Sequence, residues 1–318
     1  GLTALSFSSF SLTTSEPQSY KQALQCPHWF NFMLKEFNAL QNQNTWTLVP
    51  SSPTQNIVGC KWVFRIKKGS DGSIARYKSC LVAKGYLQEV AIDFLDTFSP
   101  VAKLPTIRVF ICIALHYNWP IQQLDVSNAF LHGNLEEDVF MSQPPGFVHS
   151  QFPTYVCKLN KSLYGLKQAP RAWFSTFSNF LLTLGFVNSH CDNSLFVQAT
   201  SALFTYLLVY VDDILITGSS PFHLKYLITL LHSAFSLKEL GNLSYFLSIS
   251  VTSTISGYFL SQSQYASTLL KRVGMTDCKP ASSPLSAKPV VSSSDVPFTT
   301  PALYRSLVGG LQYLTITH

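Results

Sequence analysis

Two adjacent carboxylates, Asp212 and Asp213, stand between two apolar runs of strand-forming residues, 207–211 and 214–216. The pattern predicts a strand, a tight turn and a second strand, with the aspartates at the turn. The pair makes a poor structural turn, because two-residue hairpins favour a glycine that accepts a positive φ. Neighbouring anions also repel each other, more strongly between apolar walls. A bound divalent cation would offset this repulsion, whereas the alternative is an exposed acidic turn on an ordinary hairpin.

A third carboxylate, Asp125, lies near the end of a predicted strand that begins at Ile121 and runs into a short turn or helix before Gly133. A lone aspartate in such a place is commonly a cap. Three carboxylates at the ends of adjacent strands can instead hold two Mg²⁺ ions about 3.5–4 Å apart. That geometry serves in-line phosphoryl transfer, with one ion activating a primer 3′-hydroxyl and the other binding a triphosphate.

A predicted hairpin upstream carries much of the positive charge. Residues 61–67 alternate basic and apolar side chains, 70–73 form a turn signal, and 74–85 would be the returning strand. Seven of the 22 basic residues lie between 61 and 84, against one acid, Asp71. A two-stranded ribbon with one basic face suits the phosphates of a nucleic acid or a triphosphate. A solvated charged hairpin is an equally open interpretation.

Residues 161–173 are predicted to open a helix that continues to a stop at Gly185. Its first turn would carry Lys167, Gln168 and Arg171, and a helix N-terminus favours anions. Simple helix capping is the alternative. The other predicted elements are helices at 27–41, within 99–120, 221–235, 264–273 and from 301, strands at 45–49, 243–251 and 257–261, and two strands within 194–217.

The composition indicates a globular chain, with 47% hydrophobic and 12% charged residues among 318. The net charge of +6 permits a polyanionic partner without requiring one. The seven cysteines are scattered without zinc spacing, which predicts reduced thiols in a cytosolic or nuclear setting. No apolar run reaches the roughly 18–20 residues of a membrane span. The chain starts on Gly1, so we expect it to be a piece of a longer protein.

The segment Tyr210-Val211-Asp212-Asp213 resembles the Tyr-x-Asp-Asp motif of reverse transcriptases, and its surroundings resemble the copia-type branch of LTR retrotransposons. That motif alone is weak evidence, but an ordered set of matching stretches covers nearly the whole chain from about residue 16. These stretches are 61–64, 76–78, 81–85, 97–101, 124–133, 143–147, 162–173 and 245–247.

The resemblance implies an α+β right-hand polymerase fold with fingers, a palm built on an antiparallel sheet, and a partial thumb. The reverse transcriptase domain would span 16–275, with the basic hairpin of the fingers at about 59–88 and the palm core at about 121–251. Residues 1–15 would be a loose tail. Residues 276–318 would be a Ser/Pro-rich linker and the truncated start of a connection toward a missing RNase H.

The resemblance also implies the roles of individual residues. The catalytic residues would be Asp125, Asp212 and Asp213, which together with Val126 would bind two Mg²⁺ ions, or Mn²⁺ in their place. Phe130 corresponds to the side chain that excludes a ribose 2′-hydroxyl, and Val211 would face the primer end. Further substrate contacts would come from Lys78, Lys167, Gln168 and Tyr210.

Three departures from the family pattern predict a decayed element copy with weak or no polymerase activity. The family usually has an arginine where this chain has Cys80, and a thiol cannot make a charged bidentate contact. The Glu-Gly expected after Gln88 is Val90-Ala91, and Ser248 replaces a glycine. An inactive nucleic-acid-binding remnant and a non-functional structural remnant are therefore alternatives.

The implied partners are an RNA or DNA primer–template and dNTPs, with the missing RNase H and integrase regions of the same polyprotein and no membrane. The implied location is the cytoplasm, within a virus-like particle, and the nucleus.

Overall fold

The computed structural model describes residues 15–68, 73–255, 257–281 and 299–314. The predicted turn at 70–73 and the predicted Ser/Pro-rich linker therefore lie largely outside the described residues, as does nearly all of the predicted N-terminal tail. The described chain is α+β, as predicted, with several sheets and helices. No helix within the described ranges combines the length and apolar character needed to cross a bilayer.

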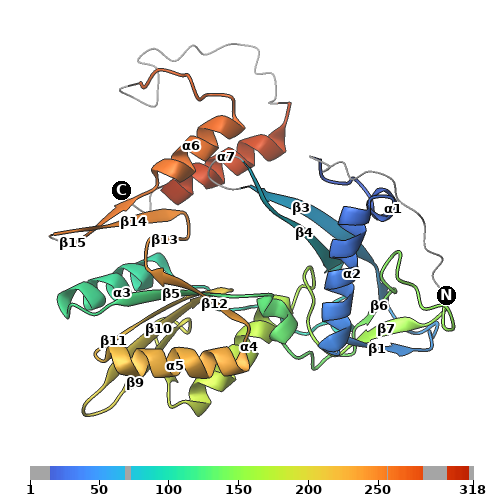
Figure 1. The fold of residues 1–318 in the computed structure, drawn as a ribbon, viewed down its shortest axis with the longest axis horizontal. Coiled ribbons are helices and arrows are strands. Elements are labelled where there is room, and N and C mark those ends of the chain that lie inside the picture. Colours follow the sequence, from blue (N-terminus) through green and yellow to red (C-terminus); the bar gives the residue numbers. More distant parts are fainter. Residues whose placement is uncertain (1–14, 69–72, 256, 282–298, 315–318) are drawn as a thin grey trace.

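A six-stranded sheet forms the centre of the fold (Figure 1). Its strand order is β12 (Leu237–Asn242), β5 (Ile121–Val126), β11 (Asp213–Gly218), β10 (Phe204–Tyr210), β9 (Leu195–Ala199) and β8 (Val187–Asn188). Every neighbouring pair is antiparallel. The prediction of two strands within 194–217 is wrong, because a turn at 200–203 folds β9 back onto β10 and makes a third.

Helices cover both faces of this sheet because its strands alternate apolar side chains between them. On one face, Leu124 and Ile214 pack with α4 (Ala169–Thr183) and α5 (Pro221–Ala234). On the other, Leu208 and Leu215 pack with α3 (Leu104–His116). Figure 1 shows α3 and α5 on opposite sides of the strands. The central sheet is therefore clamped from both sides, which fixes the ends of its strands.

The predicted basic hairpin is an antiparallel ribbon of β3 (Cys60–Lys68) and β4 (Ile74–Ala83). Its register places Arg65 opposite Lys78 and Lys67 opposite Arg76, so these side chains share one face. The alternate residues of β3 point to the other face, where Trp62 and Phe64 are buried against α2 (Pro27–Asn42). The alternation of basic and apolar residues therefore predicted this ribbon correctly.

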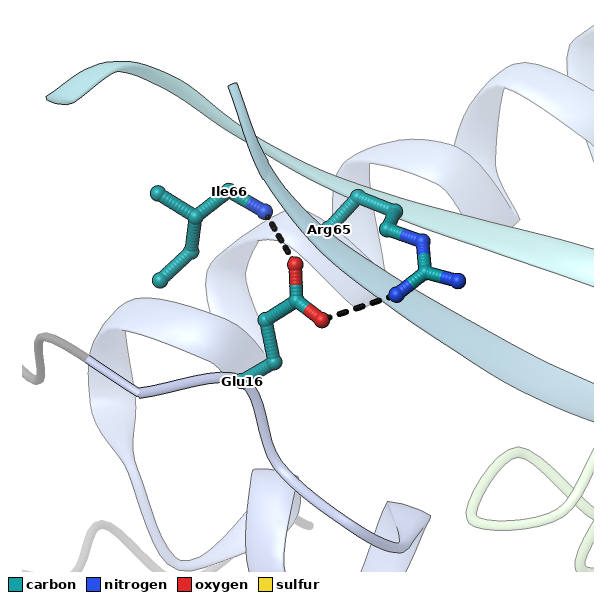
Figure 2. Close-up of polar contacts among 3 residues, drawn as sticks. All are labelled: Glu16, Arg65 and Ile66. Atoms are coloured by element: carbon teal, nitrogen blue, oxygen red, sulfur yellow. Dashed lines mark hydrogen bonds and ion pairs between the residues drawn. The ribbon is translucent and has the colours of Figure 1, made fainter. Parts of the chain in front are cut away.

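A short N-terminal segment is fastened to the edge of the ribbon. The two carboxylate oxygens of Glu16 accept hydrogen bonds from the backbone N–H of Ile66 and from Nη1 of Arg65, each at 2.9 Å (Figure 2). Next along the chain come α1 (Tyr20–Leu24) and α2. Beneath α2 lies a four-stranded sheet in the order β1 (Trp46–Val49), β7 (Val156–Leu159), β6 (Phe140–Met141) and β2 (Ile57–Val58).

The C-terminal part packs a small sheet against two helices. Its elements are β13 (Tyr245–Phe246), β14 (Ile249–Thr254), β15 (Gly257–Ser261), α6 (Ser263–Arg272) and α7 (Pro301–Leu314). The Tyr313 hydroxyl on α7 donates a 2.6 Å hydrogen bond to the Leu247 carbonyl, which ties the last helix to the small sheet. Two short 3-10 helices, η1 (Gly85–Leu87) and η2 (Ala129–His132), complete the described chain.

Candidate active site

The central sheet brings the predicted carboxylates together in one row. Asp213, the first residue of β11, lies directly opposite Asp125 on β5, and Asp125 lies opposite Lys238 on β12. On the other side of β11, Asp213 is paired with Tyr210. Directly opposite residues on antiparallel strands point to the same face. The row therefore concentrates two carboxylates beside one lysine at the end of the sheet, with Asp212 in the adjoining turn.

The turn itself is a two-residue hairpin connection made of Val211 and Asp212. Val211 has φ +56°, a left-handed conformation that a β-branched residue rarely adopts. Such strain costs on the order of 1–3 kcal/mol and persists only where the surroundings hold it. Here the Trp173 indole N–H donates to the Val211 carbonyl at 2.6 Å, and the Val126 N–H donates to the Asp212 carbonyl at 2.8 Å. The surrounding fold therefore fixes where the aspartates sit.

Burial, together with neighbouring negative charge, disfavours the ionised forms of Asp212 and Asp213. Burial raises the pKa of Asp213 to about 6, and the nearby charges of Asp212 and Asp125 add to the rise. Burial also raises the pKa of Asp212, Asp125 adds to that rise, and the Lys78 ammonium opposes it. Mutual repulsion of this kind is common where titratable groups serve chemistry, although structural charge networks can also produce it.

The donor set fits a hard cation such as Mg²⁺ in its chemistry, because the three aspartates offer only oxygen atoms. A cation among them would also relieve the repulsion that raises the pKa of Asp213. In this conformation, however, the described residues contain no group of three or more His, Cys, Asp or Glu side chains arranged closely enough to hold a metal ion. The three aspartates are therefore neighbours, but their carboxylate oxygens do not point to one common position where a cation could bind.

An open cavity of about 780 Å³ lies between the basic ribbon and two of the aspartates, Asp125 and Asp212. Its sheet side includes Asp125, Val126 and Asp212, and its ribbon side includes Arg76 and Lys78. The two features that the sequence predicted separately, an acidic site and a phosphate-binding face, therefore line the same space.

Phe130 and its neighbour Tyr164 form another wall near this cavity. Their rings meet edge to face with centroids 5.1 Å apart, and Tyr164 lines the cavity. The Ser162 hydroxyl donates to the Phe130 carbonyl and so fixes η2 beneath the ring. The Lys78 Nζ lies 5.8 Å from the centre of the Tyr164 ring. Sequence reasoning missed Tyr164, although it lies inside a stretch that matches the family.

Lys167 and Gln168 lie outside the helix that was predicted to carry them. The helix α4 begins at Ala169, because Pro170 suits a first turn and Gly165 reverses the chain with φ +92°. Lys167 and Gln168 therefore precede the helix, so the predicted first turn is wrong for these two residues and correct for Arg171. Its Nζ donates to the Gln88 carbonyl at 3.1 Å.

Gln168 has only 2% of its surface exposed and fixes the loop that follows β4. Its side-chain nitrogen donates to the Asp93 carbonyl at 2.8 Å, and its oxygen accepts from the Gln88 amide at 2.9 Å. The structure thus gives both side chains roles in holding that loop, while their contact with substrate stays a prediction.

The three departures from the family pattern differ in their surroundings. Ala91 and Ser248, the two positions at which the resemblance implied glycine, have φ +65° and φ +61°. Left-handed backbone of this kind favours glycine, so both substitutions place a side chain where it costs stability.

Cys80 lies half-buried on β4, where burial raises the pKa of its thiol and the nearby Glu36 carboxylate raises it further. A neutral thiol therefore lies close to Lys78 and Glu36, two residues that line the cavity.

Comparison with known proteins finds relatives along most of the chain. A family model described as "Reverse transcriptase (RNA-dependent DNA polymerase)" matches residues 43–287. The chain is 50% identical over 305 residues to a retrovirus-related Pol polyprotein from transposon RE1 of Arabidopsis thaliana, covering 95% of this chain and 21% of that protein. The corresponding protein from transposon RE2 is 48% identical, with the same coverage.

A more distant relative, the retrovirus-related Pol polyprotein from transposon TNT 1-94 of Nicotiana tabacum, is 37% identical over 314 residues. The match covers 95% of this chain and 24% of that protein. The chain thus spans about a fifth to a quarter of the length of these curated relatives.

Proposed function

The chain belongs to the reverse transcriptase family, as the reverse transcriptase domain of a copia-type transposon Pol polyprotein. From this premise we propose that it extends a primer by RNA-directed DNA synthesis. The observation that carries the proposal is the pairing of Asp213 with Asp125, with Asp212 in the adjoining turn. The cavity that Asp125 and Asp212 share with the basic ribbon supports it, because phosphates need positive charge close to the reacting centre.

In this proposal Asp125, Asp212 and Asp213, with the Val126 carbonyl, hold two Mg²⁺ ions, or Mn²⁺ in their place. The ions, when bound, supply the charge that activates the primer 3′-hydroxyl and neutralises the triphosphate. The carboxylates must first converge, and Asp213 must be deprotonated, which its pKa of about 6 allows at neutral pH.

Other side chains would position the substrates. Lys78 and the basic face of the ribbon bind the triphosphate. Phe130, braced on Tyr164, blocks a ribose 2′-hydroxyl, while Tyr210 and Val211 support the primer end. Lys167 and Gln168 act on the nucleotide through the loop that they hold.

The proposed layout is a right hand. The ribbon and α2 would be the fingers, the six-stranded sheet the palm, and α6 the partial thumb, within a domain of residues 16–275, while α7 would begin the connection toward the RNase H region. Its partners would be a primer–template, dNTPs, and the RNase H and integrase regions of the same polyprotein. Cys60 and Cys157 are buried free thiols, which suits the proposed location in the cytoplasm and nucleus.

The test is Mg²⁺-dependent incorporation of dNTPs on a primed RNA by the purified chain. We expect synthesis that Asp212→Asn abolishes. A protein that binds primer–template with steep salt dependence but makes no product would instead be an inactive binding remnant. A protein that neither binds nor synthesises would be a structural remnant.

We further propose that this copy polymerises slowly, because a neutral thiol, Cys80, lies beside Lys78 at the edge of the proposed triphosphate site. Primer extension by the wild type and by Cys80→Arg, at matched folded concentrations, tests this proposal. Faster synthesis by the variant supports it, and robust synthesis by the wild type that the substitution does not improve contradicts it.

A further inference from the structure

The Lys78 side chain lies among groups from three separate elements. Lys78 projects from β4 into the cavity, where Asp212 approaches from the sheet and Glu36 from α2. The Tyr164 ring, 5.8 Å from Nζ, lies along the same wall. Burial raises the pKa of Glu36 and of Asp212, and the Lys78 ammonium opposes the rise at both. Lys78, Glu36 and Asp212 thus line one cavity, with the ammonium close enough to favour the charged form of both carboxylates.

Glu36 is held in this position by the ribbon. Its carboxylate accepts a hydrogen bond from the backbone N–H of Leu81, on the edge of β4 that faces α2. The neighbouring Cys80 is half-buried, and its thiol, whose pKa burial raises, adds no positive charge. The cavity thus contains a fixed carboxylate, Glu36, that lies outside the row of aspartates.

From this arrangement we propose that Glu36 is a positioning residue for Lys78, and that it limits how strongly the cavity binds a polyphosphate. The proposal rests on the proposed function, because it takes the cavity to be the triphosphate site. It assigns Glu36 no contact with the reacting atoms.

The physical reason is competition for one cation. A cation at the aspartates would neutralise Asp212, and Glu36 would then be the remaining anion that attracts Lys78. An incoming phosphate must share the ammonium with this carboxylate and is also repelled by it. Removing the charge of Glu36 while keeping its shape should therefore tighten polyphosphate binding about threefold to tenfold, the range for one charge beside a half-buried ammonium.

Titration calorimetry with inorganic tripolyphosphate and Mg²⁺ tests the proposal on the whole chain. The central variant is Glu36→Gln, which keeps an oxygen that can accept the Leu81 N–H. The matched control is Glu136→Gln, which removes the same charge from an exposed residue that lines a different cavity. We expect tighter binding for Glu36→Gln alone, and a smaller effect at high salt.

A second comparison separates positioning from a general charge effect. Glu36→Gln is introduced again in a Lys78→Gln background, which forms a double-mutant cycle. The proposal requires that the gain in affinity disappear when Lys78 is absent. An equal gain in both backgrounds, or no gain from Glu36→Gln in the wild type, overturns it. A purely structural Glu36 would give unchanged affinity and only altered stability.

Failure of this proposal is distinguishable from failure of the proposed function. Polyphosphate binding is measured without primer or synthesis, whereas the proposed function is judged by primer extension against Asp212→Asn. A chain that synthesises DNA but shows no Glu36 effect would retain the proposed function and lose only the inference about Lys78.

Discussion

Neutralising Asp213 should stabilise the protein in the absence of divalent cations. In the fold, burial and the charges of Asp212 and Asp125 raise the pKa of this carboxyl from 3.8 to about 6. The ionised form is therefore disfavoured in the native state relative to the unfolded chain. Asparagine has nearly the same shape and no charge, so Asp213→Asn removes this cost at the expense of the proposed chemistry.

The size and pH range of the effect follow from those two values. The difference between 3.8 and about 6 corresponds to about 3 kcal/mol. Because Asp213 is only half-buried, solvent screening reduces this to about 1–2 kcal/mol. The cost is absent below the unfolded pKa, builds between about pH 4 and pH 6, and is constant above. Asp213→Asn should thus be more stable than the wild type at pH 7.5 and lose about half of that advantage at pH 5.

Urea unfolding in EDTA at these two pH values measures the effect. Asp96→Asn is the matched control, because the Phe98 backbone N–H and the Arg171 guanidinium lower the pKa of that exposed carboxyl and its removal should bring no gain. Added Mg²⁺ should stabilise the wild type and leave Asp213→Asn unchanged. No gain at pH 7.5, or a gain that does not depend on pH, would refute the reasoning.

Three further predictions concern backbone and substrate fit. Ala91→Gly and Ser248→Gly should each raise the free energy of unfolding by about 0.5–1 kcal/mol, because both positions have positive φ. Thermal unfolding measures this change, and a loss of stability would contradict the prediction. Phe130→Ala should raise ribonucleotide incorporation relative to deoxyribonucleotides in primer extension, and an unchanged ratio would exclude the role of the ring. Gly165→Ala should lower the free energy of unfolding by more than about 3 kcal/mol or prevent folding, because the added methyl would overlap the last carbonyl of β4 and the residue would keep a positive φ. Gly274→Ala, which has a positive φ but open space around it, should lower it by only about 1 kcal/mol. Equal losses for the two variants would show that the overlap with β4 is unimportant.

The sequence predicted those parts of the site that depend on local periodicity. The alternation in 61–67 placed basic side chains on one face of the ribbon, and the apolar runs around Asp212 and Asp213 located the hairpin. Which strand lies beside β11 depends on pairing between distant segments, so the direct opposition of Asp125 and Asp213 rested on resemblance to the family.

Other elements could not be predicted because their signal is not local. The strand β12 is mostly exposed and lacks an apolar alternation, and it exists because β5 offers a free edge for pairing. Glu36 looks like one polar residue on an amphipathic helix, and only the packing of α2 across β4 brings it to Lys78.

The hydrogen bond from Trp173 to the strained turn has a genetic consequence. Trp173 lies in an aromatic cluster, with ring centroids 5.2 Å from Phe177 and 5.3 Å from Phe235. The left-handed Val211 is kept in place partly by that indole. A transposon copy released from selection can therefore lose the proposed active-site geometry through substitutions at any of these uncharged positions. The number of positions at which a substitution can inactivate the copy is therefore much larger than the three aspartate codons. A copy that keeps all three aspartates can still be inactive.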